Sequence, residues 1–368
     1  HVTVQVYRKH SGKKIRYDIT RGMVPIKSVE STQMVTDEIG YIKLARFAET
    51  TPAEFELAAK KLLNNGMTKL ILDLRDNGGG YLHAAVELAD HFLSNGRMIV
   101  YTEGRYNGRT DYYASHRGRL ENVQVAILIN ANTASASEIV SGAIQDNDKG
   151  IVLGRRSYGK GLVQEPIQLT DGSAIRLTVA RYYTPSGRCI QKPYGEGIDY
   201  AADYADRYEN GEFYKLDSSK LADLEQFKTV KGRTVYGGGG IFPDVFIPLD
   251  TIGASSYLTH LAYTSSFTEF AFEFVDRNRK QLGNYRNARD FDTHYSISES
   301  MYQEFVEFAE KQHKVVADPY GIVASADRIK TRLKAQIAQN LWEENGWFTV
   351  FIKKDQEVKK AIEEMEKL

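Results

Sequence analysis

Residues 122–147, NVQVAILINANTASASEIVSGAIQDN, run from an apolar strand pattern into a helix pattern. The apolar run predicts a buried strand over 123–130, and the amphipathic part predicts a helix over about 135–145. A cluster of small hydroxylated residues joins them, so Ser135 stands at the start of the predicted helix. Upstream, KLILDLRDNGGGYL at 69–82 has the same order of strand, turn and helix. This alternation predicts layered α/β structure.

The pattern extends on both sides of this stretch. We expect strands at 2–6, 15–19, 40–47, 69–74, 98–101, 151–153, 162–169 and 174–183, and helices at 52–65 and 81–94. Residues 184–250 are rich in Gly, Asp and Tyr and predict long loops around one short helix near 218–226. From about residue 255 the period is helical, with segments near 256–279, 296–314, 323–344 and 354–367. The chain therefore ends in a helical region.

Composition narrows the classes of protein. A length of 368 residues predicts two to three domains, and 48 basic against 48 acidic side chains give no bias toward nucleic acid. Cys189 is the only cysteine, so no intrachain disulfide and no cysteine-rich zinc site can form. No apolar run is long enough for a membrane span, and the first residues read as a strand rather than a signal peptide. Because the chain starts at His1, we expect a processed or trimmed product.

Ser135 has two interpretations. A serine at a helix start has backbone N–H groups and the positive end of the helix dipole beside it, which suits a nucleophile whose attack creates an oxyanion. Ser135 and Glu138 also have the S-x-x-E spacing of a capping box, a purely structural role. This stretch alone leaves both open.

A serine nucleophile needs a base, and Lys160 in SYGKG is the candidate that stands out. A lysine held in an apolar site loses solvation of its charged form, so its pKa falls and it can accept a proton. The alternative is a solvated lysine in a turn. Structural roles are expected for the histidines, and the HExxH spacing of zinc peptidases is absent; the histidines considered are His10, His83, His91, His116, His260, His294 and His313.

Consecutive glycines follow the strand in LDLRDNGGGYL at 72–82. The backbone N–H groups of Gly78, Gly79 and Gly80 could point at a bound oxygen without an intervening side chain, as in an oxyanion hole or a phosphate cradle. A simple tight turn is the alternative. Neither the Walker spacing nor GxGxxG occurs here.

Together these segments resemble a known family. TASASEIVSGAIQDN, then GKGLVQ with its lysine 25 positions after Ser135, then DGSAIRLTVARYYTPSGR are similar to the carboxyl-terminal processing peptidases of peptidase family S41. LRDNGGG matches the glycine turn of that family, and YGGGGIFPDVF at 236–246 resembles the segment that closes its catalytic domain. The resemblance covers about residues 40–250.

The resemblance implies a role for each matched residue. Ser135 would be the nucleophile, Lys160 the general base and Gln164 the residue that orients the lysine. The backbone N–H of Ala136 and one from Gly78 or Gly79 would bind the oxyanion. Fully extended, residues 160 and 164 would lie roughly 13 Å apart. We therefore expect a bend around Lys160, or a different role for Gln164.

The resemblance also implies a fold and a division of the chain. We expect a mixed α/β protein with a ClpP/crotonase-like layered core. The expected parts are the end of a PDZ-like domain with a connecting strand around 25–29 (residues 1–35), the serine peptidase domain (36–250) and a helical C-terminal domain (251–368). The implied location is periplasmic, or otherwise outside the cytoplasmic membrane.

The predicted function is therefore a serine endopeptidase that cuts protein substrates in their C-terminal regions through an acyl-enzyme. Its partners would be protein or peptide substrates, without nucleic acid, cofactor or metal, and assembly into a homo-oligomer is left open. Two alternatives remain: a crotonase-like acyl-CoA enzyme, and a catalytically silent peptide-binding protein. The many tyrosines, among them Tyr182, Tyr183, Tyr200 and Tyr204, could line a substrate groove, although structural roles are favoured.

Overall fold

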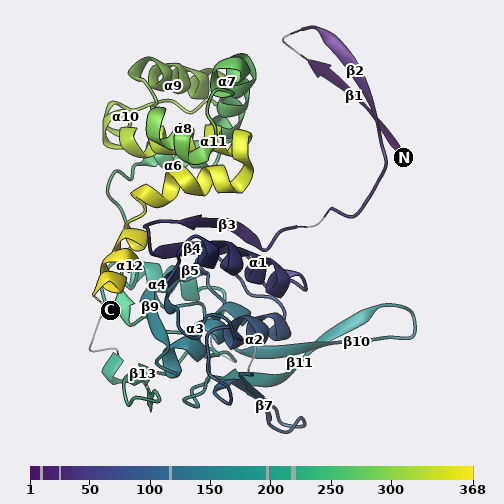
Figure 1. Ribbon diagram of the computed structural model, residues 1–368, viewed down its shortest axis with the longest axis vertical. Coiled ribbons are helices and arrows are strands. Elements are labelled where there is room, and N and C mark those ends of the chain that lie inside the picture. Colours follow the sequence, from purple (N-terminus) through teal and green to yellow (C-terminus); the bar gives the residue numbers. More distant parts are fainter. Residues whose placement is uncertain (9–10, 25, 116–117, 196–198, 217–220, 368) are drawn as a thin grey trace.

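The centre of the molecule is a six-stranded sheet (Figure 1). The computed structural model describes residues 1–368 except 9–10, 25, 116–117, 196–198, 217–220 and 368. The strand order is β14 (Val245–Phe246), β9 (Gly150–Gly154), β8 (Gln124–Ile129), β5 (Lys69–Asp73), β4 (Ile39–Leu44) and β3 (Val29–Met34). Only β3 runs antiparallel to its neighbour. Parallel neighbours require crossover connections, and these supply the helices.

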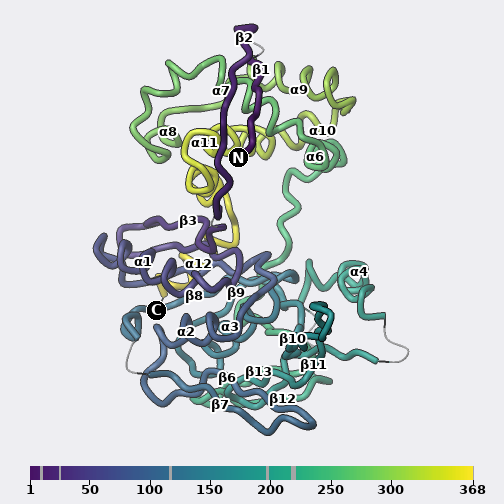
Figure 2. The backbone as a smooth tube through the Cα atoms, turned by 90° about the vertical axis from the view of Figure 1, so that its right-hand side faces the viewer, coloured from purple at the N-terminus to yellow at the C-terminus, as the bar shows by residue number. Residues whose placement is uncertain are grey.

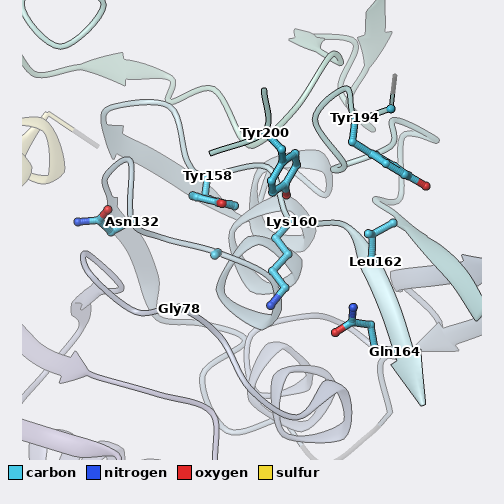
Figure 3. A pocket seen from close by; sticks show the side chains of 10 residues that line it. Gly78, Asn132, Tyr158, Lys160, Leu162, Gln164, Tyr194 and Tyr200 are labelled. Carbon is cyan, nitrogen blue, oxygen red and sulfur yellow. The ribbon is translucent and has the colours of Figure 1, made fainter. Parts of the chain in front are cut away.

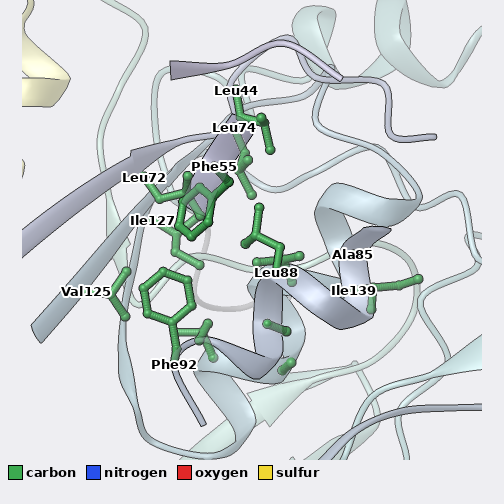
Figure 4. Close-up of a cluster of buried hydrophobic side chains, with 14 of the residues drawn as sticks. Leu44, Phe55, Leu72, Leu74, Ala85, Leu88, Phe92, Val125, Ile127 and Ile139 are labelled. Atoms are coloured by element: carbon green, nitrogen blue, oxygen red, sulfur yellow. The ribbon is translucent and has the colours of Figure 1, made fainter. Parts of the chain in front are cut away.

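Three helices cover one face of this sheet, namely α1 (Thr51–Asn64), α2 (Leu82–Asp90) and α3 (Ala136–Asp146). Side chains alternate between the two faces of a strand, so Leu70 and Leu72 of β5 point toward the helices while Ile71 points away. Figure 4 shows part of the resulting core, in which Phe55 of α1 and Phe92 after α2 pack over the strands. This core fixes the strand ends at which the candidate site lies.

A second, antiparallel sheet stands beside the first. Its order is β10 (Leu162–Gln168), β11 (Ala174–Tyr183), β6 (Met98–Glu103) and β7 (Thr110–Tyr113). The hairpin of β10 and β11 projects from the body of the protein (Figure 1). The following segment contains α4 (Asp203–Glu209) and a small sheet of β12 (Gln226–Lys228) and β13 (Thr234–Tyr236). The base of the projecting hairpin borders the candidate site.

The C-terminal part is helical and has its own core, rich in aromatic rings. Its helices are α6 (Ser256–Ala262), α7 (Ser266–Leu282), α8 (Ala288–His294), α9 (Glu299–His313), α10 (Pro319–Ala324) and α11 (Ala326–Phe351). Phe267 and Phe270 are buried there, and both rings contact the buried ring of Phe305. This core forms separately from the core of the sheet, and Figures 1 and 2 show the bundle to one side of the sheet.

The last helix leaves the bundle and returns to the sheet. After the short helix η1 (Ile352–Lys354), α12 (Gln356–Glu366) packs Val358, Ala361 and Met365 against the sheet face opposite α1, α2 and α3. The side chain of Lys69, on β5, donates a hydrogen bond to the carbonyl of Met365 at 2.5 Å. The central sheet is thus buried on both faces, as a largely parallel sheet requires.

At the other end of the chain, β1 (Val2–Arg8) and β2 (Lys13–Ile19) pair as an antiparallel hairpin. Figure 1 shows this hairpin away from the rest of the molecule, and its side chains are almost all exposed. Its relation to a PDZ domain stays a prediction.

The expected mixed α/β fold followed by a helical C-terminal region is confirmed. Several boundaries differ. The predicted helix 256–279 is divided into α6 and α7, and the connection expected before residue 35 contains β3, a member of the central sheet. The predicted helix near 218–226 lies partly outside the described residues, and its last residue begins β12. Short irregular segments carry little periodicity, so α4, β7 and the small sheet of β12 and β13 were not predicted.

Candidate active site

Ser135 lies between the end of β8 and the start of α3. Its backbone has φ 57° and ψ −116°, a left-handed conformation that costs a non-glycine residue about 1–3 kcal/mol. The preceding loop is held firmly, because the Thr133 hydroxyl donates to the carbonyl of Leu74 at 2.9 Å and the Ala134 N–H donates to the carbonyl of Asn77 at 3.0 Å. The structure therefore maintains a strained turn that leaves Ser135 half-buried.

The glycine turn after β5 packs directly against Ser135. A Cβ on Gly79 would lie 2.7 Å from the Cβ of Ser135 and 2.8 Å from the backbone nitrogen of Ala136, and Gly79 has φ 94°. Only glycine fits this approach. The Gly79 N–H donates to the side-chain oxygen of Asn77 at 2.9 Å. Gly78 lines a cavity together with Lys160 and Gln164.

Lys160 and Gln164 both line one cavity of about 740 Å³. The Lys160 side chain extends between the Gly78 turn and the Gln164 amide (Figure 3). The bend expected near Lys160 is present: Gly159 has φ 84°, and β10 begins only at Leu162. One expectation is wrong, because Lys160 is exposed rather than held in a dry apolar site. Lys160 lines the cavity and its side chain is open to solvent.

Glu138 connects the two segments that carry Ser135 and Lys160. Its side chain is fully buried and accepts four hydrogen bonds. One oxygen accepts from the Ser157 hydroxyl at 2.5 Å and the Gly159 N–H at 2.7 Å, and the other from the N–H groups of Ser135 at 2.7 Å and Lys160 at 2.9 Å. Burial raises the pKa of the Glu138 carboxyl, although these hydrogen bonds oppose the shift. Capping is thus only part of what Glu138 does.

A second buried carboxylate supports the glycine turn from β5. Asp73 accepts hydrogen bonds from Tyr41 at 2.7 Å and from the Arg75 side chain at 3.0 Å, and it pairs with Lys43 at 3.3 Å. Burial opposes ionisation of Asp73, but Arg75 and Lys43 hold the pKa of its carboxyl well below the usual range. Arg75 also pairs with Asp355 at 2.8 Å. Arg75, which precedes the glycine turn, is therefore bound to Asp355 at the start of α12.

Tyrosines form much of the cavity wall. Tyr158, Tyr194 and Tyr200 line it together with Leu162 and Ala134 (Figure 3). Of the tyrosines singled out above, only Tyr200 belongs to this wall. Of the other three, Tyr182 is buried in the main core, Tyr183 stacks on Tyr101, and Tyr204 packs on Phe213.

The histidines lie elsewhere in the described part of the chain. His83 and His91 line a different cavity beside α1 and α2, where His83 lies 3.1 Å from Glu49. His10 and His116 lie outside the described residues. Within the described ranges no cluster of three or more His, Cys, Asp or Glu side chains could hold a metal ion, and no helix is long and apolar enough to cross a membrane.

Sequence reasoning missed Glu138 as a connecting residue, and it also missed Asp73 and Arg75. Asp73 and Arg75 belong to the motif LDLR at 72–75. Two opposite charges at the end of an apolar strand could have indicated a buried ion pair there. Of the residues predicted for the site, Gly78, Lys160 and Gln164 line the cavity, and Gly79 packs against Ser135 and Ala136.

Comparison with known proteins gives two family matches. Residues 38–201 match the model of peptidase family S41, and residues 257–343 match a family of unknown function, DUF8443. The carboxy-terminal-processing protease of Bartonella bacilliformis is 35% identical over 237 residues, which cover 63% of this chain and 53% of that protein. The chloroplastic carboxyl-terminal-processing peptidase 1 of Arabidopsis thaliana is 38% identical over 171 residues, 46% of this chain and 34% of that protein.

The chain spans between a third and about half of the length of these curated relatives. A solved structure of a photosystem II D1 C-terminal processing protease is 26% identical, covers 68% of this chain and 55% of its own, and superimposes with a TM-score of 0.44. The resemblance seen in the motifs is confirmed by the family match. Over residues 38–201 this chain matches peptidase family S41, and the curated relatives that it resembles include carboxyl-terminal-processing proteases.

Proposed function

We propose that this protein is a serine endopeptidase with a Ser135/Lys160 dyad that cuts protein substrates in their C-terminal regions. The observation that supports this most is that Glu138 binds the backbone N–H of both Ser135 and Lys160 through one carboxylate oxygen. Two segments 25 residues apart are thereby held at one site. The names of the relatives support the C-terminal specificity.

In the proposed reaction, the Ser135 hydroxyl attacks the scissile carbonyl carbon while Lys160 Nζ takes the hydroxyl proton. The tetrahedral intermediate then collapses. The peptide C–N bond breaks, Lys160 returns the proton to the leaving amine, and an ester on Ser135 remains. Water activated by Lys160 hydrolyses this ester and restores the serine. Gln164 faces Lys160 across the cavity (Figure 3) and would orient its amine.

For the oxyanion we assign the backbone N–H of Ala136 and that of Gly78. Ala136 is the first residue of α3, where N–H groups have no partner inside the helix. Gly79 is the poorer candidate, because its N–H already donates to Asn77. Gly78 lines the cavity, and a Cβ there would meet nothing within 4 Å. This distinguishes the two glycines that the sequence left equivalent.

Lys160 must be unprotonated to act as a base, and it is exposed to water in the free protein. An extended substrate in the cleft would cover the amine and remove water from it. Loss of solvation disfavours the ammonium form. We therefore assign the activation of the lysine to the complex with substrate.

The division of the chain into a PDZ-like end, a crotonase-like layered peptidase core and a helical domain is also a proposal. The packing suggests two amendments to its boundaries, since β3 belongs to the central sheet and α12 covers that sheet. A location outside the cytoplasmic membrane rests on the family resemblance alone.

Mass spectrometry of a digested unfolded protein tests the function. We expect cleavage by the wild type in the presence of EDTA, and at least a thousandfold slower cleavage by Ser135→Ala and by Lys160→Ala. A thioester hydrolysed equally by wild type and Ser135→Ala would instead indicate the acyl-CoA enzyme. Peptide binding without any cleavage would indicate the silent binding protein.

A further inference from the structure

A second lysine packs against two tyrosines of the cavity wall. Lys192 is 3% exposed, and its Nζ lies 4.1 Å from the ring centre of Tyr158 and 4.1 Å from that of Tyr200. The two rings meet edge to face with centres 6.1 Å apart. A cation near two aromatic rings is attracted by both, and the attraction grows when water is excluded.

The ammonium of Lys192 also has hydrogen-bond acceptors. It donates to Asp203 of α4 at 3.0 Å and to the carbonyl of Tyr200 at 3.3 Å. Arg207 approaches the same Asp203 oxygen at 3.9 Å, so two cations share one carboxylate. A buried ammonium with these partners holds the ring of Tyr158 and the ring of Tyr200 in place relative to one another.

The backbone of Lys192 holds the catalytic segment as well. Its N–H donates to the carbonyl of Gly159 at 2.9 Å, next to Lys160. The N–H of Tyr158 in turn donates to the carbonyl of Thr133 in the loop before Ser135. A movement of the two tyrosine rings would therefore alter the cavity immediately beside the dyad.

The cavity that these rings line suits an apolar side chain. Of the described residues that line it, Lys160 alone is charged, and its other walls combine Leu162, Ala134 and the tyrosine rings with the neutral amides of Asn132 and Gln164. A substrate carboxylate here would pair with Lys160 and keep it protonated, which opposes its role as a base. A substrate cation would face Lys160 without a carboxylate among the described lining residues to receive it.

We propose that Lys192 is a positioning residue that clamps Tyr158 and Tyr200 into the wall of a subsite for an apolar substrate side chain next to the scissile bond. The inference rests on the proposed peptidase function and deepens it. It assigns the side-chain preference of the enzyme to a buried cation that does not touch the substrate.

The test uses three peptides that carry leucine, alanine or glutamate at the residues flanking the scissile bond. The neutral variant Lys192→Met is compared with Lys192→Arg, which keeps a cation able to stack on aromatic rings. Lys149→Met is the control, because Lys149 is a partly buried lysine that binds the carbonyls of Glu121 and Val123 beyond the far end of α3. Thermal unfolding of each variant accompanies the kinetics.

We expect the wild type to prefer the leucine peptide over the alanine peptide by about tenfold or more in kcat/KM and to reject glutamate. Lys192→Met should reduce the leucine preference to below about threefold through a higher KM, with kcat within about twofold. Lys192→Arg should recover most of the preference, and Lys149→Met should keep it. An unchanged preference in Lys192→Met, or an equal loss of kcat on the leucine and alanine peptides, would overturn the inference.

Binding separates this inference from the proposed catalysis. In a Ser135→Ala background, fluorescence anisotropy of the labelled leucine peptide should show about tenfold weaker binding after Lys192→Met. If the wild type cleaved nothing while this binding difference persisted, the catalytic proposal would fail and the Lys192 assignment would stand. If Lys192→Met did not fold, Tyr200→Ala provides the same test, because it removes one wall directly; an unaltered leucine preference there would refute the subsite.

Discussion

Replacing Glu138 by glutamine changes one atom of the site and tests how the two candidate catalytic segments are held. Glu138 accepts two hydrogen bonds on each oxygen, and three of the four donors are backbone N–H groups. Glutamine presents an NH₂ group in place of one oxygen. In either orientation of the amide, at least one backbone N–H then faces another donor inside the protein.

The expected cost follows from these contacts. Each unmade buried hydrogen bond costs about 1–3 kcal/mol, so one or two lost bonds cost about 1–6 kcal/mol. Burial raises the pKa of Glu138, which means that burying its charge opposes folding, and glutamine removes that opposing contribution. We therefore expect a net loss of about 2 kcal/mol, or roughly 4–8 °C in Tm for a domain of this size. Cleavage should fall more than tenfold, because Ser135 and Lys160 share one oxygen.

Thermal unfolding and peptide cleavage measure the two effects on the same preparation. Glu165→Gln is the matched control, since Glu165 is exposed on β10 and the same chemical change there should alter neither quantity. A Glu138→Gln protein with wild-type Tm and wild-type cleavage would refute the reasoning. A loss of Tm alone, with full activity, would refute the claim that Glu138 positions the dyad.

Three further predictions concern buried charges and the last helix. Asp146→Ala should lower the free energy of unfolding by about 3–5 kcal/mol in urea titrations, because the buried Arg188 guanidinium loses the carboxylate that lies 2.7 Å away and keeps only neutral hydrogen-bond acceptors; a smaller loss than in an exposed-pair mutant would contradict this. Asp73→Asn should flatten the acid side of the stability profile: the folded-state pKa of Asp73 is depressed, so its contribution is present above the ordinary value near 3.9 and is lost as pH falls below it. Identical urea midpoints against pH for wild type and Asp73→Asn would show that the pairing with Arg75 contributes nothing. Deleting residues 352–368 should uncover the apolar sheet face, which ANS fluorescence would report as increased binding together with a lower Tm; unchanged fluorescence would mean that the helix does not cover the sheet in solution.

The sequence was informative where the signal is local. Local pattern predicted β5, β8 and α3, because the two strands are short apolar runs and the helix segment follows with a helical period. The bend at Lys160 was also predictable, since Gly159 and Gly161 flank the lysine. Local pattern thus located the segments that carry the candidate site.

The connections between those segments were not predictable from local pattern. Glu138 shows the S-x-x-E spacing of a cap, but its other donors at Gly159 and Lys160 come 21 and 22 residues later. Likewise the amphipathic pattern of α12 indicates an apolar face without indicating which surface covers it. The exposure of Lys160 depends on the width of the cleft, which is formed by segments far apart in the chain.

The position of α12 has a consequence for biosynthesis. Roughly 120 residues separate the last strand of the central sheet from the last apolar side chain of α12, and a ribosome adds them in about 6–24 s. During that interval the apolar face of the sheet that α12 covers is exposed to solvent. A peptidase built in this way would complete the packing of its central sheet only after α12 has emerged from the ribosome. The growing chain would be most accessible to chaperones during that period. It would also be least able to cleave neighbouring proteins then.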